Sequence, residues 1–140
     1  MERNDIKIDT KDISSKNLEG KIDSKDKEAN LSLEEIVRLT NIIGLKYAEA
    51  KKEFDRLDLF KAVIRARISM RIEETTREKL TEVKLKRLTE TDPEYISYLE
   101  KLLEAKNSAE NLKIRYDSYK NLFEAKRSLM SYQKAELKLL

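Results

Sequence analysis

The chain has 140 residues and a formal net charge of +3, from 30 lysines and arginines against 27 aspartates and glutamates. It contains no cysteine and no histidine, which excludes disulfides, thiolate nucleophiles, imidazole bases and the usual zinc and copper ligands. Two glycines, one proline and a charged fraction of 41% are typical of long helices and coiled coils rather than of sheets.

The hydrophobic fraction of 39%, with 6% aromatic residues and no tryptophan, indicates one slender domain with a thin core. No apolar run approaches the roughly 18 residues of a membrane-spanning helix. The opening sequence MERNDIKIDT also lacks the basic and apolar regions of a secretory signal. We therefore expect a soluble cytoplasmic protein without membrane contact, and the small net charge by itself does not point to a polyanionic partner.

Residues 1–30 are rich in aspartate, lysine, asparagine and serine, with isolated isoleucines at positions 6, 8, 13 and 22. These isoleucines follow neither a strand period nor a helix period, so the segment is predicted to be a disordered tail. The alternative is a docking peptide in which Ile6 and Ile8 serve as anchors.

Two helix starts follow the tail. Ser32 and Glu35 have the spacing of a capping box, in which each side chain accepts a hydrogen bond from the backbone of the other. Asp92 can cap a second helix, with Pro93 at its first position and Glu94 near the positive end of its dipole. We expect residues 31–140 to form one helical domain in which two long helices meet near residue 91.

Both expected helices carry an apolar seam with steps of three and four residues, the pattern of a coiled coil. The seam of the first helix consists of Ile36, Thr40, Ile43, Tyr47, Ala50, Phe54, Leu57, Lys61, Ile64, Ile68 and Arg71. The seam of the second consists of Tyr95, Tyr98, Leu102, Ala105, Ala109, Leu112, Tyr116, Tyr119, Phe123, Lys126, Met130, Gln133 and Leu137. The sequence therefore predicts an all-α fold, a long antiparallel hairpin of coiled-coil type.

Folding the chain about residue 90 brings each seam position opposite another seam position. In this register Ile68 faces Leu112 and Ile64 faces Tyr116, and the same offset continues along both helices. The predicted hairpin and oligomer core comprises Ile64, Ile68, Leu112, Tyr116, Tyr119, Phe123 and Met130.

The first seam fails beyond Arg71, at Thr75, Glu78 and Glu82. A kink or a short third helix is therefore expected within residues 76–89. Several large apolar residues lie off both seams, and such surface commonly meets other subunits, so we expect a homo-oligomer. These residues are Leu59, Val63, Met70, Leu103, Leu122 and Leu129.

Basic residues recur along the second helix at one heptad position, over roughly 40 Å of helix length. They are Lys106, Lys113, Lys120, Arg127 and Lys134. Such a stripe suits a phosphate backbone. However, acids stand three residues before Lys113, Lys120 and Arg127, so a solvated face with internal ion pairs is the simpler interpretation.

The stretch FKAVIRARISMRI, residues 60–72, contains four basic residues and no acid. Arg65 and Arg67 have no acid three or four residues away, and neither has Arg115 on the second helix. In the predicted register Arg67 and Arg115 approach each other across the seam, which is unfavourable unless an anion lies between them. The candidate anions are an acid of a neighbouring subunit, a nucleic-acid phosphate, or ions of the solvent.

No arrangement of residues indicates an active site. The adjacent carboxylates Glu34 and Glu35, like Glu73 and Glu74, diverge by about 100° on a helix and cannot act on one substrate. No glycine-rich phosphate loop and no calcium-loop spacing is present. We expect a protein without enzymatic activity that binds no metal, cofactor or small-molecule substrate.

Three stretches occur in an order that suggests a family: YAEAKKEFDRLDLFKAVIRARISMR, then DPEYISYLEKLLEA, then YDSYKNLFEAKRSLMSYQKAEL. Over residues 45–138 the chain resembles small coiled-coil proteins of phage and prophage recombination modules and, more distantly, the UvsY-type recombination mediators of T-even phages. The chain departs from that family in its long N-terminal segment and its mild net charge.

The resemblance implies an oligomeric helical protein, in a bacterial or phage-infected cell, that binds single-stranded DNA. It also implies that the protein helps a recombinase displace the single-strand-binding protein. The family's basic run maps to Lys61, Arg65, Arg67 and Arg71, and its terminal helix to the oligomer interface. The candidate nucleic-acid contacts are therefore Lys61, Arg65, Arg67, Arg71, Arg115, Lys120 and Arg127. The competing prediction is a structural or protein-interaction coiled coil without nucleic-acid contact.

Overall fold

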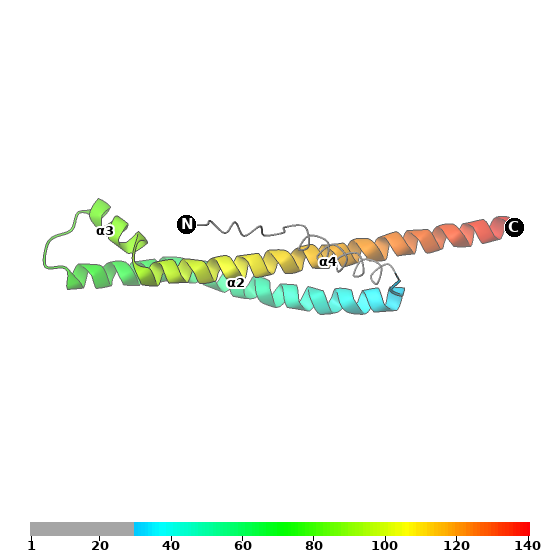
Figure 1. The fold of residues 1–140 in the computed structure, drawn as a ribbon, viewed down its shortest axis with the longest axis horizontal. Coiled ribbons are helices and arrows are strands. Elements are labelled where there is room, and N and C mark those ends of the chain that lie inside the picture. Colours follow the sequence, from blue (N-terminus) through cyan, green and yellow to red (C-terminus); the bar gives the residue numbers. More distant parts are fainter. Residues whose placement is uncertain (1–29) are drawn as a thin grey trace, which may run out of the picture.

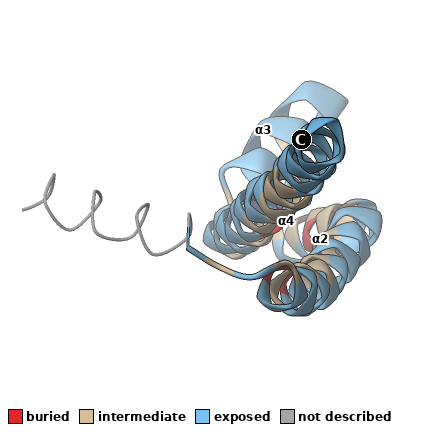
Figure 2. Ribbon diagram, turned by 90° about the vertical axis from the view of Figure 1, so that its right-hand side faces the viewer, coloured by how far each residue is buried: buried red, intermediate tan, exposed pale blue. Residues whose placement is uncertain are grey.

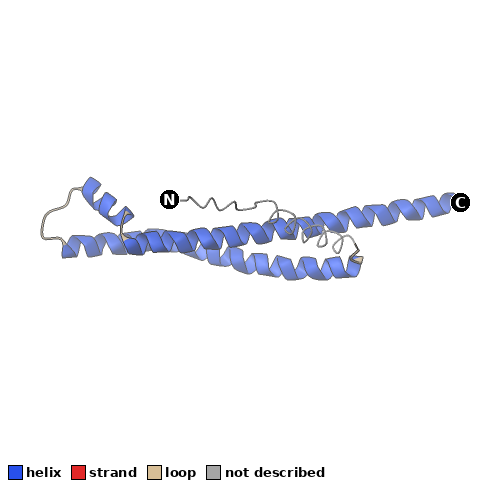
Figure 3. Ribbon diagram, in the orientation of Figure 1, coloured by secondary structure: helices blue, strands red, loops and turns tan. Residues whose placement is uncertain are grey.

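The computed structural model describes residues 30–140, which form three helices and no strand. Helix α2 spans Leu33–Thr75, α3 spans Glu82–Glu90 and α4 spans Pro93–Leu139 (Figures 1 and 3). The predicted all-α hairpin is thereby confirmed, and the predicted third helix is present as α3. The predicted tail of residues 1–30 lies outside the described residues except for Asn30.

The two long helices begin where the capping signals place them. The N–H of Glu35 donates to the Ser32 hydroxyl at 3.2 Å, and the N–H of Ser32 donates to the Glu35 carboxylate at 2.8 Å. Asp92 accepts from the N–H of Glu94 at 2.9 Å, with Pro93 in the first turn of α4. Side-chain caps satisfy N–H groups that have no partner inside the helix, so these residues fix both starts.

Helices α2 and α4 run antiparallel side by side, and the few buried residues lie along their contact, except for Thr89 of α3 (Figure 2). The buried apolar residues of the described chain are Ile36, Ile43, Ile68, Tyr95 and Ala109. All of them belong to the two predicted seams, and the remaining positions of both seams up to Ile68 and Lys126 are half-buried. No helix within residues 30–140 is long and apolar enough to cross a membrane.

The register of the hairpin differs from the predicted one. The Tyr116 ring stacks on Tyr47, with centroids 6.2 Å apart, rather than on Ile64. The Tyr98 hydroxyl donates to the Leu57 carbonyl at 2.5 Å, which shows a shift in the same direction nearer the turn. Tyr116 thus meets α2 about five helical turns earlier in the chain than predicted, and Tyr98 about seven turns earlier. The predicted pairing of Ile68 with Leu112 is wrong for the same reason.

The chain between the long helices accounts for this shift. Helix α2 ends at Thr75, and after a short loop α3 returns alongside α2 before α4 begins (Figure 1). The N–H of Lys84 donates to the Thr81 hydroxyl at 3.3 Å, which caps the start of α3. Residues 76–92 continue neither seam. Helix α4 therefore starts beside Arg71, and not opposite a first helix that continues beyond Thr75.

A glycine in the middle of α2 supports the observed register. A Cβ atom added to Gly44 would lie 2.9 Å from Cε2 of Tyr116. Real Cβ atoms do not approach side chains so closely, and the Tyr116 ring is also held by its stacking on Tyr47. The close approach of α4 at this point therefore requires glycine, although glycine costs a helix about 1 kcal/mol relative to alanine.

Because α4 is longer than α2 and shifted against it, its C-terminal part extends beyond the start of α2 (Figure 1). The Lys126 ammonium donates to the carbonyl of Leu31, just before α2 begins. Residues 127–140, called here the α4 extension, are all exposed. Met130 is 45% exposed, so its prediction as a hairpin core residue is wrong.

Candidate functional site

The arginines of α2 that have no acid nearby in sequence contact acids at the junction of α3 and α4. Arg71 binds both Asp92 at 2.8 Å and Glu94 at 2.5 Å. Arg67 also binds Glu94 at 2.5 Å, and Arg65 binds Glu90 at 3.1 Å. These six residues, called here the arginine cluster, tie the returning chain to α2. The anions that face these arginines are therefore carboxylates of the same chain, which the sequence interpretation had not considered.

The arginine cluster lowers the pKa of two acids, Glu94 and Asp92. Hydrogen bonds from Arg67 and then from Arg71 hold the pKa of Glu94 below its usual value. Partial burial of Asp92 acts to raise its pKa, but the hydrogen bonds from Arg71 and from the N–H of Glu94 outweigh it, so this pKa is also lowered. Both carboxylates remain ionised at neutral pH, and they lie at the positive end of the α4 dipole.

Arg67 and Arg115 do not face each other, contrary to the prediction. Arg67 contacts Glu94, which precedes Arg115 by 21 positions on the same helix, and that spacing amounts to about 31 Å. Arg115 is exposed on α4. The anion site predicted between these two guanidinium groups is therefore absent from the hairpin.

The basic stripe of α4 carries two of the three internal ion pairs that the sequence spacing predicts, whereas Glu110 contacts Lys106 at 4.0 Å instead of Lys113. Lys120 binds Asp117 at 2.9 Å and also lies 4.5 Å from the centre of the Tyr116 ring. Arg127 contacts Glu124 at 3.9 Å. Lys120 and Arg127, both candidate DNA contacts, are thus partly neutralised by acids one helical turn away.

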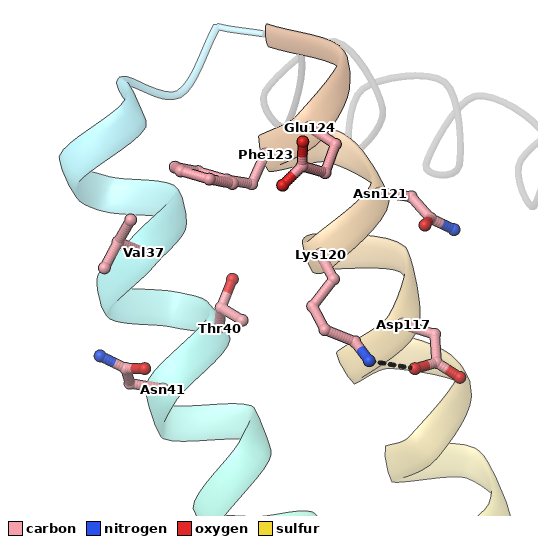
Figure 4. A pocket seen from close by; sticks show the side chains of 8 residues that line it. All are labelled: Val37, Thr40, Asn41, Asp117, Lys120, Asn121, Phe123 and Glu124. Atoms are coloured by element: carbon pink, nitrogen blue, oxygen red, sulfur yellow. Dashed lines mark ion pairs between the residues drawn. The ribbon is translucent and has the colours of Figure 1, made fainter. Parts of the chain in front are cut away.

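A groove of about 610 Å³ lies between the first turns of α2 and the middle of α4 (Figure 4). Val37 and Phe123 provide apolar surface on opposite walls, and the Lys120–Asp117 ion pair lies at one end. The groove is amphipathic, but its charged side chains already form ion pairs, Lys120 with Asp117 and Glu124 with Arg127. It offers no group of residues with a shared chemical task.

A second groove, of about 720 Å³, separates α2 from α3. Lys61 and Arg65 of α2 and Lys86 of α3 line it, together with the acids Asp58 and Glu82. Neither Lys61 nor Lys86 forms an ion pair with any residue of the described chain. Two of the candidate DNA contacts, Lys61 and Arg65, line this groove, and of these two only Arg65 forms an ion pair within the described residues.

The predicted core residues of the hairpin, apart from Met130, lie along the contact of the two long helices, but opposite other partners than predicted. Ile68 is 1% exposed, and the others are half-buried along the contact of α2 with α4. These half-buried residues are Ile64, Leu112, Tyr116, Tyr119 and Phe123. They form the seam of one chain, so their contribution to an oligomer interface stays a prediction.

The hairpin leaves the α4 extension uncovered, although the sequence interpretation had assigned Met130 to the hairpin and oligomer core and Leu129 to contacts with other subunits. The extension carries Leu129, Met130, Leu137 and Leu140 with 56%, 45%, 70% and 103% exposure, respectively. Met130 and Leu137 continue the same seam that α4 uses against α2. The seam itself is visible in the sequence, but the length that stays uncovered depends on the register, which lets α4 extend beyond the start of α2.

Within residues 30–140, no group of three or more acidic side chains is arranged to hold a metal ion. Comparisons with protein-family models, with curated proteins and with solved structures find no match to this chain.

Proposed function

We propose that the protein is a non-enzymatic helical hairpin that acts by protein–protein association, with the α4 extension as its binding surface. The observation that carries this proposal is the apolar seam of α4, which continues through Met130 and Leu137 beyond the start of α2, where no helix of the described chain covers it. A seam of this kind is stabilised by burial against another helix. The arginine cluster supports a structural role for the hairpin, because it fixes α3 and α4 against α2.

The test is a mass measurement in solution by light scattering over a wide range of protein concentration. The proposal expects a mass above that of one chain, rising with concentration. Changing both Met130 and Leu137 to glutamate should return the mass to one chain while helicity by circular dichroism stays unchanged. The proposal would be rejected if the unmodified protein had the mass of one chain at every concentration and also bound no other protein.

A second candidate function is the binding of single-stranded DNA as a recombination accessory, with a recombinase or a single-strand-binding protein as the protein partner. The groove between α2 and α3 favours it, because Lys61 and Lys86 lie there without a carboxylate partner in the described chain. Several weak basic sites in one oligomer would add their affinities for one strand.

The test of this second candidate is binding to a labelled oligonucleotide at several salt concentrations. Phosphate contacts predict affinity that falls steeply as salt rises. Changing Lys61 and Lys86 to glutamate should abolish binding, whereas the same change at the exposed Lys46 and Lys52 should weaken it far less. No binding at low salt would reject DNA as a partner.

A further inference from the structure

We infer that α3 is a flap that opens away from α2 while α2 and α4 stay folded against each other. The Arg65–Glu90 ion pair is the polar contact that holds it closed. The inference goes beyond the proposed function, because α3 lies near the turn of the hairpin, at the end opposite the α4 extension (Figure 1).

Helix α3 depends on the rest of the chain for its stability. It has nine residues, whereas isolated helices shorter than roughly 12 to 15 residues are marginal in water. Thr89 is its one buried residue, at 2% exposure, and Leu85 is half-buried. Val83 and Leu88 are 62% and 39% exposed. The apolar burial that holds α3 against α2 is therefore small.

The groove beneath α3 shows where its packing on α2 is incomplete. It has a volume of about 720 Å³, and α2 contributes the short side chains Ala62, Ala66 and Ser69 to its lining. Side chains of this size leave the space between the two helices unfilled, so both helices lose dispersion contacts there. The buried contact of α3 is confined to Thr89, near its C-terminal end.

One polar contact joins α3 to α2 among the described residues. Arg65 donates to Glu90 at 3.1 Å, and both side chains are partly exposed, at 43% and 45%. The hydroxyl of the buried Thr89 donates to the Leu85 carbonyl at 2.9 Å, within α3 itself. Opening of α3 therefore breaks one exposed ion pair and leaves the Thr89 hydroxyl paired. An ion pair with this exposure is weak, and salt screens it further.

The start of α4 is held independently of α3. Arg71 binds Asp92 and Glu94, and Arg67 binds Glu94. These contacts lie beyond the end of α3, and residues 76–81, which connect α2 to α3, are not helical. Both connections of α3 can therefore change their backbone angles while Arg67 and Arg71 keep α4 in place.

The position of α3 determines the form of the groove that the second candidate function uses. Lys61 contributes to this groove from α2, and Lys86 contributes to it from α3. The two cations line one groove only while α3 is docked, and opening separates them. The flap thus controls whether α2 and α3 offer a common basic site.

The absence of cysteine from the sequence allows the opening to be measured by thiol labelling. Thr89→Cys places a thiol in the buried contact of α3, and Ala109→Cys places one in the hairpin core, where Ala109 is 6% exposed. Each labelling rate is divided by the rate of the same protein unfolded in urea. Thr89→Cys should then react at least about tenfold faster than Ala109→Cys. Sodium chloride at about 1 M should raise the rate of Thr89→Cys and leave that of Ala109→Cys nearly unchanged.

A substitution that removes one charge tests the role of the ion pair. Glu90→Gln in the Thr89→Cys protein should raise the labelling rate about two- to fivefold, the factor that corresponds to an exposed ion pair. Glu53→Gln is the matched control, because it removes a similarly exposed ion pair with Arg56 that lies within α2. It should leave the rate nearly unchanged. Equal rates in the two variants would overturn the inference.

Hydrogen exchange of the unmodified protein measures the opening without any substitution. The backbone amides of residues 86–90 should exchange at least about tenfold faster than those around Ile68, which the hairpin buries. Equal protection of these two regions, or equal normalised labelling at positions 89 and 109, would show that α3 opens only together with the hairpin and would overturn the inference. These measurements do not depend on the mass of the protein in solution, so the proposed function is tested separately.

Discussion

The substitution Ile68→Ala tests the observed core of the hairpin. Ile68 is 1% exposed and is one of five buried apolar residues in the described chain. The change removes three carbon atoms, which corresponds to about 2.4 kcal/mol of transfer free energy at roughly 0.8 kcal/mol each. A small cavity term raises the expected loss to about 3 kcal/mol, within the usual range for such changes. The melting temperature should then fall by roughly 10 to 15 °C.

The free energy of unfolding is measured by urea titration followed by circular dichroism, at a fixed low protein concentration. Met70→Ala is the matched control, because Met70 lies on the same helix but is 60% exposed. It should change the free energy of unfolding by less than about 0.5 kcal/mol. A loss below about 1 kcal/mol for Ile68→Ala, or an equal loss for the control, would show that this contact is not the core.

Three further predictions concern the register, the arginine cluster and one hydrogen bond. Gly44→Ala should destabilise the hairpin, although alanine favours the helix by about 1 kcal/mol relative to glycine. When Tyr116 is also changed to alanine, the substitution at Gly44 should become stabilising. Urea titration of the unmodified protein, the two single variants and the double variant measures the coupling between the two positions. Arg67 and Arg71 hold the pKa of Glu94 below its usual value in the folded protein. The ionised Glu94 carboxylate therefore stabilises the fold fully at a pH above the pKa of Glu94 in the unfolded chain. This stabilisation is lost as the pH falls through the lowered pKa of the folded protein. Urea midpoints measured from neutral to acid pH should therefore fall, and Glu94→Gln should flatten that fall; an unchanged profile would contradict the ion pairs. Tyr98→Phe removes the donor to the Leu57 carbonyl and should cost about 1 kcal/mol by thermal unfolding, whereas no change would show that the bond is not formed in solution.

The helical faces could be predicted from the sequence, but the register could not. A seam position recurs every three or four residues, so seam layers meet both in the predicted register and in the observed one. The partner of Tyr116 depends on how far α4 slides along α2. That offset is set by residues 76–92, whose loop and short helix carry no seam, and by the single small residue Gly44.

The arginine contacts could not be found from local spacing. Arg65 and Arg67 have no acid one turn away on their own helix, and their partners Glu90 and Glu94 lie 25 and 27 positions along the chain. Only the return of the chain through α3 brings these charges together. The pairs along α4 were predictable, because acid and base are three residues apart on one helix, as in Asp117 and Lys120.

The observed register is the central claim, because both the arginine cluster and the α4 extension depend on it. Spin labels on Met70→Cys and Ile114→Cys test it directly, since both positions are exposed, at 60% and 64%. Met70 precedes Arg71, which binds Asp92, so Ile114 lies about 30 Å farther along α4. Electron spin resonance should give a distance near that value, whereas a separation of roughly 10 Å, as expected if the chain folded symmetrically about residue 90, would contradict the account.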